Sequence, residues 1–227
     1  MKKKIVIVSL IVCILVLSIA STTMAYFTDT EEATNTFTVG DVKIKLTEIK
    51  QDGTQAEADG TALQLVYNNI YPTQTILKQP TITNISTADN VYIGAVITLK
   101  TVEKNETDFK EEIANLFADE NAVKAFLSGG ALNTADGYAV KVVATDAYTY
   151  TVYIIAKASV AKDIGVALFE DLVIPATWDN EDMAIFSTLS IKVDAYATQV
   201  AGLADGVTAI TTVFGANTGD VFNGVFN

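Results

Sequence analysis

Apolar and polar residues alternate with a period of two in several segments of this chain. Val42, Ile44 and Leu46 alternate with lysine and threonine, and residues 190–198 alternate in the same way. This period places successive side chains on opposite faces of a β-strand. Stretches rich in Val, Ile, Thr and Tyr predict further strands. These stretches are residues 62–67, 81–85, 91–100, 138–144, 148–157 and 168–174.

The segments between the predicted strands carry turn residues. The acidic, glycine-flanked stretch 52–60 predicts a loop or a hairpin tip, and residues 145–147 predict the turn of a hairpin. Near the end of the chain, residues 207–214 fit either a short helix or a strand. The hairpin-type dipeptide Asn223-Gly224 predicts an edge strand over residues 220–227.

One segment has a helical rather than a strand period. It predicts an amphipathic helix over residues 105–127, within a helical insertion at about 105–128. Asn105 or Thr107 is the expected N-cap. A second turn or two could run from Ala122 to the expected stop at Gly129-Gly130. The apolar positions that define the helical face are Phe109, Ile113, Leu116 and Phe117.

About eight short strands with one helical interruption, and no strand–helix alternation, favour an all-β fold. The expected architecture is an antiparallel jelly-roll-type sandwich with a helical insertion, preceded by an N-terminal signal helix. No internal repeat of 20–50 residues is present, which argues against a solenoid. We expect a single jelly-roll domain over residues 40–227.

The first 25 residues have the organisation of a signal peptide. Three lysines precede an uncharged run from Ile5 to Ala20, and small residues Thr23 and Ala25 stand at positions −3 and −1 if the mature chain begins at Tyr26. As a helix the run spans about 24 Å, short of a bilayer core of about 30 Å. Cleavage is therefore preferred over an uncleaved anchor or a lipoprotein site at Cys13. The expected localisation is secreted, in the extracellular matrix or on the cell surface.

Composition limits the possible functions. Half of the 227 residues are hydrophobic, so the chain can build a core. Removal of residues 1–25 leaves 202 residues without cysteine, with 12 lysines against 27 acidic residues and a net charge of −15. Such a surface repels nucleic acid.

Candidate catalytic and metal-binding patterns are weak. The chain has no histidine, which removes the imidazoles of HExxH zinc sites and of serine or cysteine triads. Ser159 and Lys162 match SxxK, but the companion SDN and KTG motifs are missing. Asp52-Gly53 and Asp136-Gly137 are interpreted as turns rather than calcium ligands, and Trp178 as a packed residue rather than a sugar platform. We expect no catalytic residue, no cofactor and no metal.

Three segments carry a family resemblance. Residues 25–48, AYFTDTEEATNTFTVGDVKIKLTE, combine the aromatic pair Tyr26-Phe27, an acidic stretch and the pattern Asn35-x-Phe37-x-x-Gly40 before an alternating strand that ends in an acid. This block resembles the TasA/camelysin family of exported bacterial surface and biofilm-matrix proteins. Residues 69–97 and 191–203 are similar to the same family, with Thr73 where the family usually has a glycine after the turn proline.

The resemblance implies export through a dedicated signal peptidase, a jelly-roll fold and assembly into fibres. In these fibres the freed N-terminal segment of one subunit completes the sheet of the next. On this chain the candidate donor strand is the extension Tyr26–Val39, with Phe27, Phe37 and Val39 as anchors. The segment could also pair with its own domain or stay frayed.

The expected function is therefore a non-enzymatic structural subunit of a biofilm-matrix or surface fibre. Its expected partners are other copies of itself joined head to tail, the signal peptidase and other matrix proteins. The alternatives are a surface adhesin or binding module that does not polymerise, and a hydrolase with an acidic site. Camelysin-type relatives are described as metalloproteases, and this chain lacks the imidazoles of such sites.

Overall fold

The computed structural model describes residues 41–49, 52–57, 69–87, 90–101, 112–134 and 136–226. Several predictions lie outside these residues. They are the signal peptide 1–25, the extension 26–39, the strand 62–67 and the helix caps Asn105 and Thr107. The described residues belong to one compact unit, Gly40–Asn227.

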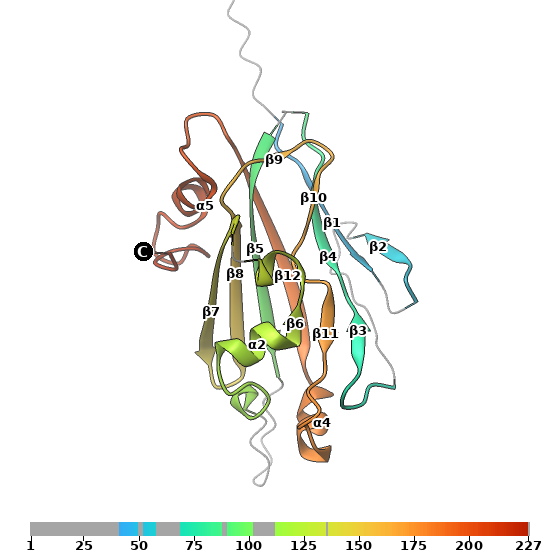
Figure 1. The fold of residues 1–227 in the computed structure, drawn as a ribbon. Coiled ribbons are helices and arrows are strands. Elements are labelled where there is room, and N and C mark those ends of the chain that lie inside the picture. The colour runs from blue at the N-terminus through green and yellow to red at the C-terminus, as the bar shows by residue number, and fades with distance from the viewer. Residues whose placement is uncertain are drawn as a thin grey trace, which may run out of the picture. The chain divides into compact units, whose positions relative to one another are not determined.

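The largest sheet has the strand order β12-β5-β8-β7 (Figure 1), and every neighbouring pair is antiparallel. A short strand, β9, also pairs with β5. The predicted strands at 91–100, 138–144, 148–157 and 190–198 are confirmed here, as is the hairpin between the second and third of them. The bounds are β5 Asn90–Lys100, β7 Tyr138–Asp146, β8 Thr149–Ala156, β9 Val160–Ala161 and β12 Ser190–Gln199.

Two smaller antiparallel sheets have the orders β10-β4-β1-β2 and β3-β11-β6. The first contains β1 Ile44–Ile49, β2 Gln55–Glu57, β4 Pro80–Asn84 and β10 Gly165–Ala167, and the second contains β3 Thr75–Leu77, β6 Leu127–Ser128 and β11 Asp171–Val173. The antiparallel all-β class is thus confirmed for the described part of the chain. The jelly-roll topology stays a prediction.

Three expectations about these smaller sheets need correction. The hairpin alternative at 52–60 holds for Asp52-Gly53, but its tip is shorter than predicted, because residues 55–57 pair back onto β1 as strand β2. Thr47 was expected on the wet face of its strand, yet only 4% of its surface is exposed because strands flank it on both sides. Of the strand predicted at 168–174, only Asp171–Val173 pairs as β11.

The core lies on both faces of β5. Its odd-numbered residues, such as Ile93 and Ile97, belong to the main apolar cluster together with Ile82 of β4. Tyr92 and Val96 point the other way, into a second cluster with Ile210. A strand covered on both faces loses the apolar–polar alternation, which explains the continuous apolar sequence of β5.

Within the described part, residues 112–127, the predicted helix over residues 105–127 is not continuous. Ile113–Asn115 form one 3₁₀ turn, η1, and helix α2 begins separately at Glu120, where Asp119 accepts hydrogen bonds from the backbone N–H groups of Asn121 and Ala122. The predicted apolar positions Ile113, Leu116 and Phe117 are nevertheless buried.

Gly129-Gly130 does not stop a helix either. Helix α2, Glu120–Phe126, has already ended, and strand β6 lies between. Helix α3, Gly130–Asn133, begins at the second glycine. A further helix, α4 Asn180–Phe186, has a capping box made by Asp179 and Asp182.

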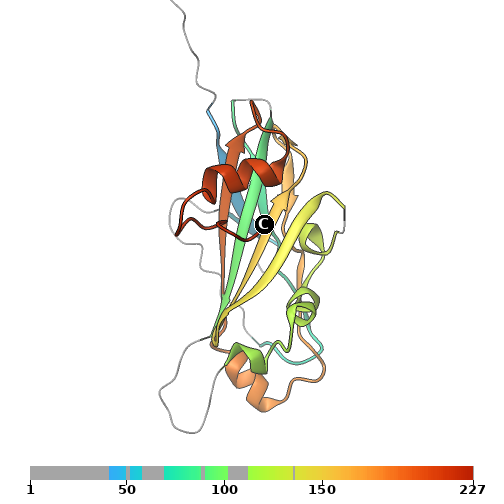
Figure 2. The ribbon, with the colours of Figure 1, turned by 90° about the vertical axis from the view of Figure 1, so that its left-hand side faces the viewer.

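The C-terminal segment covers the outer face of the large sheet (Figure 2). Helix α5, Gly206–Phe214, settles the open choice between helix and strand at 207–214. Gly94 of β5 lets it approach, because a Cβ there would come 3.0 Å from Ile210. The predicted edge strand at 220–227 is wrong: residues 221–225 form turns that place Phe222, 1% exposed, against the sheet.

Candidate functional site

Strand β12 is an edge of the large sheet. All ten of its residues pair with β5, from Ser190 opposite Lys100 to Gln199 opposite Val91. No other strand in the described ranges pairs with β12. A sheet edge presents backbone N–H and C=O groups that another strand can satisfy.

The inward face of this edge strand is apolar and incompletely covered. Ile191, Val193, Ala195 and Ala197 pack against the main core and are only partly buried. Strand β1 lies close to β12. Its inward residues Val42, Ile44 and Leu46 are partly buried at the margin of the same core. These seven side chains, here called the apolar margin, line the side of the core between β1 and β12.

The outward face of β12 is only partly exposed to solvent. Lys192 and Asp194 form an exposed ion pair with 2.8 Å between Nζ and Oδ1. The hydrogen bond that Lys192 donates to Asp194 raises the pKa of Lys192. Tyr196 instead packs edge-on against Phe214 and Phe222, beneath the C-terminal segment. Burial there raises the pKa of Tyr196. Charged residues on an edge strand are a usual defence against unselective pairing.

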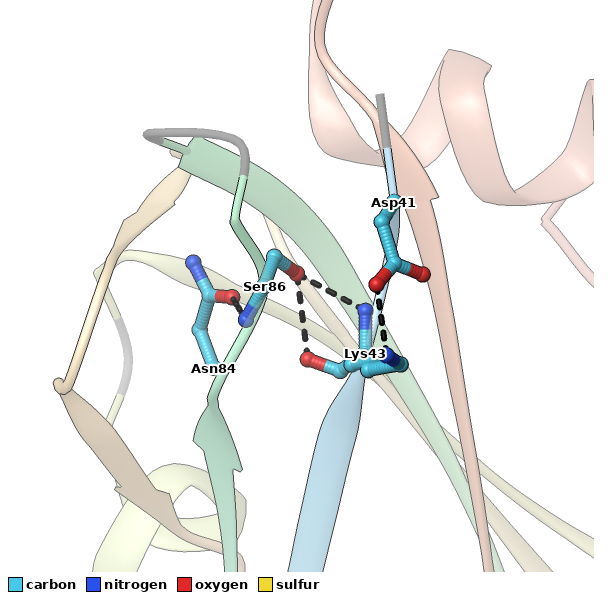
Figure 3. Close-up of polar contacts among 4 residues, drawn as sticks. All are labelled: Asp41, Lys43, Asn84 and Ser86. Carbon is cyan, nitrogen blue, oxygen red and sulfur yellow. Dashed lines mark hydrogen bonds and ion pairs between the residues drawn. The ribbon is translucent and has the colours of Figure 1, made fainter. Parts of the chain in front are cut away.

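The described chain begins at Asp41, where β1 is tied to β4 (Figure 3). The Lys43 N–H donates to Ser86 Oγ at 2.8 Å, and that hydroxyl donates to the Lys43 carbonyl at 3.0 Å. Asn84 Oδ1 accepts from the Ser86 N–H at 2.9 Å, and Asp41 forms an ion pair with Lys43. These contacts therefore hold the start of β1 against β4.

A buried ion pair joins Glu48 of β1 to Lys78, which lies between β3 and β4. Their side chains are 8% and 7% exposed. Burial lowers the pKa of Lys78 to about 8. This ion pair was not predicted from the sequence. The strand period could have indicated a buried carboxylate, because Glu48 continues the inward series of Val42, Ile44 and Leu46.

The weaker candidates fall where structural roles explain them. Trp178 is 7% exposed and packs against Phe117, Phe126 and Phe186, so it is a core residue. Ser159 and Lys162 flank strand β9 and share no helical face. The glycines of Asp52-Gly53 and Asp136-Gly137 have the positive φ of turn residues.

The remaining predicted site residues lie outside the described residues. They are the cleavage-site residues Thr23, Ala25 and Tyr26 and the strand anchors Phe27, Phe37 and Val39. The apolar margin beside β12 was not predicted from the sequence. The alternation of residues 190–198 predicted a strand with one apolar face, but it did not indicate that this strand lies at an edge of the sheet.

Within the described ranges, no three His, Cys, Asp or Glu side chains form a group able to hold a metal ion. The sequence contains no histidine at all, and its one cysteine is Cys13. This donor set does not fit a zinc site of nitrogen and sulfur ligands. No helix within the same ranges is long and apolar enough to cross a membrane.

Within the described residues, these features define an antiparallel β-protein in which β12 forms a sheet edge with an apolar margin beside it. The family described as camelysin metallo-endopeptidase matches residues 1–194. The chain therefore belongs to the TasA/camelysin family. No match was found among curated proteins or among solved structures.

Proposed function

We propose that this chain is a secreted structural subunit of a matrix or cell-surface fibre, and not an enzyme. The observation that carries the proposal is the unpaired edge of β12, ten residues long, with half-buried apolar side chains on its inner face. Membership of the TasA/camelysin family supports it. Adding a strand to this edge would satisfy its backbone groups and cover the apolar margin.

The N-terminal extension has the length and pattern of the added strand. Residues 26–39 extend to about 48 Å at 3.4 Å per residue, longer than the ten residues of β12. Ala33, Phe37 and Val39 share one face of such a strand, and threonines occupy the other. Because donor and acceptor are different surfaces, each subunit can bind the next, and an open chain of subunits results.

Removal of the signal peptide would control assembly. While residues 1–25 hold the N-terminus at a membrane, the extension cannot enter another subunit. We expect the secreted protein to begin at Tyr26, which N-terminal sequencing of the exported product checks. Secretion with residues 1–25 intact would contradict this step.

Two chains test the strand exchange, one beginning at Tyr26 and one at Gly40. Electron microscopy and sedimentation should show fibres from the first and none from the second. Within the longer chain, Phe37→Ala with Val39→Ala should raise the critical concentration at least tenfold, because each buried apolar side chain contributes about 1.5–3 kcal/mol. Thr36→Ala with Thr38→Ala, on the opposite strand face, is the matched control. Fibres from the Gly40 chain would contradict the proposal.

The family description supports a second candidate, a metallo-endopeptidase. The absence of histidine from the sequence argues against it. Casein cleavage by the mature chain, measured with added Zn²⁺ and with a chelator, decides between the two. We expect no cleavage in either condition, whereas chelator-sensitive cleavage would establish the peptidase.

A further inference from the structure

Two exposed isoleucines lie at the end of the unit where the described chain begins. Ile85 is 42% exposed and Ile164 is 54% exposed. The Ile85 N–H donates to the Lys43 carbonyl at 3.0 Å, and the Ile164 carbonyl accepts from the Asn84 N–H at 3.1 Å. Single exposed aliphatic residues need no explanation. These two, however, occupy neighbouring segments beside the origin of β1.

The length of the chain ahead of β1 brings this end close to a second copy. This step rests on the proposed function. Gly40 alone separates Val39, the last anchor of the extension, from Asp41. Two trans peptide units span at most about 7 Å between Cα atoms. A subunit that holds Val39 in its strand edge must therefore touch the end that carries Asp41, Ile85 and Ile164.

The surface met on the other subunit lies at the opposite end. An open filament requires two different contact surfaces, since contact between identical ends would close a dimer. Strand β12 runs from one end of the unit to the other. Its first residue, Ser190, follows α4, and its last residue, Gln199, pairs with Val91 at the start of β5, near β1. The second surface is therefore the end that carries α4. Tyr71, 61% exposed, belongs to it, because the nearby Thr73 N–H donates to the carbonyl of Ile174, ahead of α4.

The charges around Ile85 and Ile164 allow this end of one subunit to approach the α4 end of the next. Asp41, Lys43, Lys162 and Asp163 flank them and sum to zero. The start of α4 carries three acidic residues, Asp179, Glu181 and Asp182. In a chain with a net charge of −12, two acidic ends would repel each other. A neutral apolar end meets an acidic end without that penalty.

We propose that Ile85 and Ile164 form a subunit-junction surface that packs against the α4 end of the next copy in the fibre. The strand exchange provides the backbone pairing, and this junction buries side chains between the two bodies. The junction fixes the angle between successive subunits, which a one-residue link through Gly40 does not do alone.

The test compares variants of the mature chain beginning at Tyr26. Ile85→Glu with Ile164→Glu places two negative charges against the acidic end, and Ile85→Thr with Ile164→Thr removes apolar area without adding charge. Val213→Glu, at a residue of α5 that is 47% exposed, is the matched control. Fibre growth is followed by light scattering and electron microscopy. Binding of a labelled peptide of residues 26–39, added in excess, measures separately whether the β12 edge can still accept a strand.

We expect the glutamate pair to slow fibre growth at least tenfold and the threonine pair to slow it several-fold. Val213→Glu should grow like the parent chain, and all variants should capture the peptide equally. Normal growth of both isoleucine variants overturns the junction while leaving strand exchange intact. Loss of peptide capture by the glutamate pair would mean a damaged fold, and the threonine pair then decides. If the parent chain neither grows nor captures the peptide, the proposed function itself fails.

Discussion

Thr73 has a backbone conformation that suits glycine. Its φ is +71°, in the left-handed region, and its N–H donates to the Ile174 carbonyl at 3.1 Å. A β-branched residue in that region is strained by roughly 1–2 kcal/mol. The family resemblance had indicated glycine at this position, and the positive φ of Thr73 is the conformation that glycine adopts without strain.

Thr73→Gly should therefore stabilise the protein. We expect a gain of about 0.5–1 kcal/mol in the free energy of unfolding, since the relief of strain exceeds the backbone entropy of glycine. Urea denaturation measures the change. Asn69→Gly is the control: its φ is +59°, but asparagine tolerates that region, so its effect should be smaller. A larger gain from Asn69→Gly would refute the interpretation.

The buried pair of Glu48 and Lys78 predicts a non-additive response. Lys78→Met removes the amine that donates a hydrogen bond to a carboxylate that is 8% exposed, and this should cost about 1–3 kcal/mol. Adding Glu48→Leu removes the other charge as well, so the double variant should recover most of that loss. A double-mutant cycle in urea measures the coupling. Additive losses would show that the two side chains act independently.

Lys78 also predicts a pH dependence. Its pKa is lowered from 10.5 to about 8 in the folded protein by burial. Between these values the unfolded chain binds more protons, so the free energy of unfolding rises with pH from about 8. Burial raises the pKa of Tyr153 and Tyr196, which opposes the rise above pH 10. Thermal unfolding from pH 7 to 10 should show a rising Tm in the parent and not in Lys78→Met.

At the scale of elements, α5 depends on close contact with the large sheet. Gly206 begins the helix, its N–H donates to the Lys157 carbonyl at 3.0 Å, and a Cβ there would overlap the carbonyl oxygen of Ala156. Gly206→Ala should therefore displace α5 and open the segment after Val200 to proteolysis. Thr212→Ala, at an exposed position of the same helix, is the control. Equal protease resistance of the two variants would contradict this view.

The elements also show where sequence patterns were informative. The hairpin of β7 and β8 and the long strands β5 and β12 were predictable, because their residue types and periods agree with their final environment. Within residues 112–127 the predicted helix is interrupted, because burial of Ile113, Leu116 and Phe117 does not require one continuous helix. The cap at Asp119 begins α2 separately. The strand at 220–227 failed because Phe222 packs beneath α5 instead of pairing.

At the scale of the whole molecule, charge opposes association. Without residues 1–25 the chain would carry a net charge of −15, so approaching copies would repel each other. Salt screens this repulsion over a Debye length of about 10 Å at 0.1 M. Fibre growth should accelerate several-fold between about 10 mM and 150 mM NaCl, as measured by light scattering. Slower growth with added salt would indicate that attraction between opposite charges drives assembly.

The candidate site was only partly accessible from the sequence. The extension Tyr26–Val39 could be proposed as a donor strand only through the family resemblance, which also indicated its apolar anchors. The receiving edge could not, because its identity depends on which strands neighbour β12 in space. Ile85 and Ile164 likewise have ordinary strand and turn sequences, and only the fold places them together.

Strand β12 contributes to two separate cores, through Ile191 and Val193 on one face and Tyr196 on the other. Any ligand that rigidifies this strand therefore restrains both layers at once. The C-terminal helix would then open less often in an assembled subunit than in a free one. The free energy of opening would increase by the amount by which the neighbouring copy binds the closed form more tightly than the open form. The C-terminal segment and the neighbouring copy would then be thermodynamically linked without touching each other.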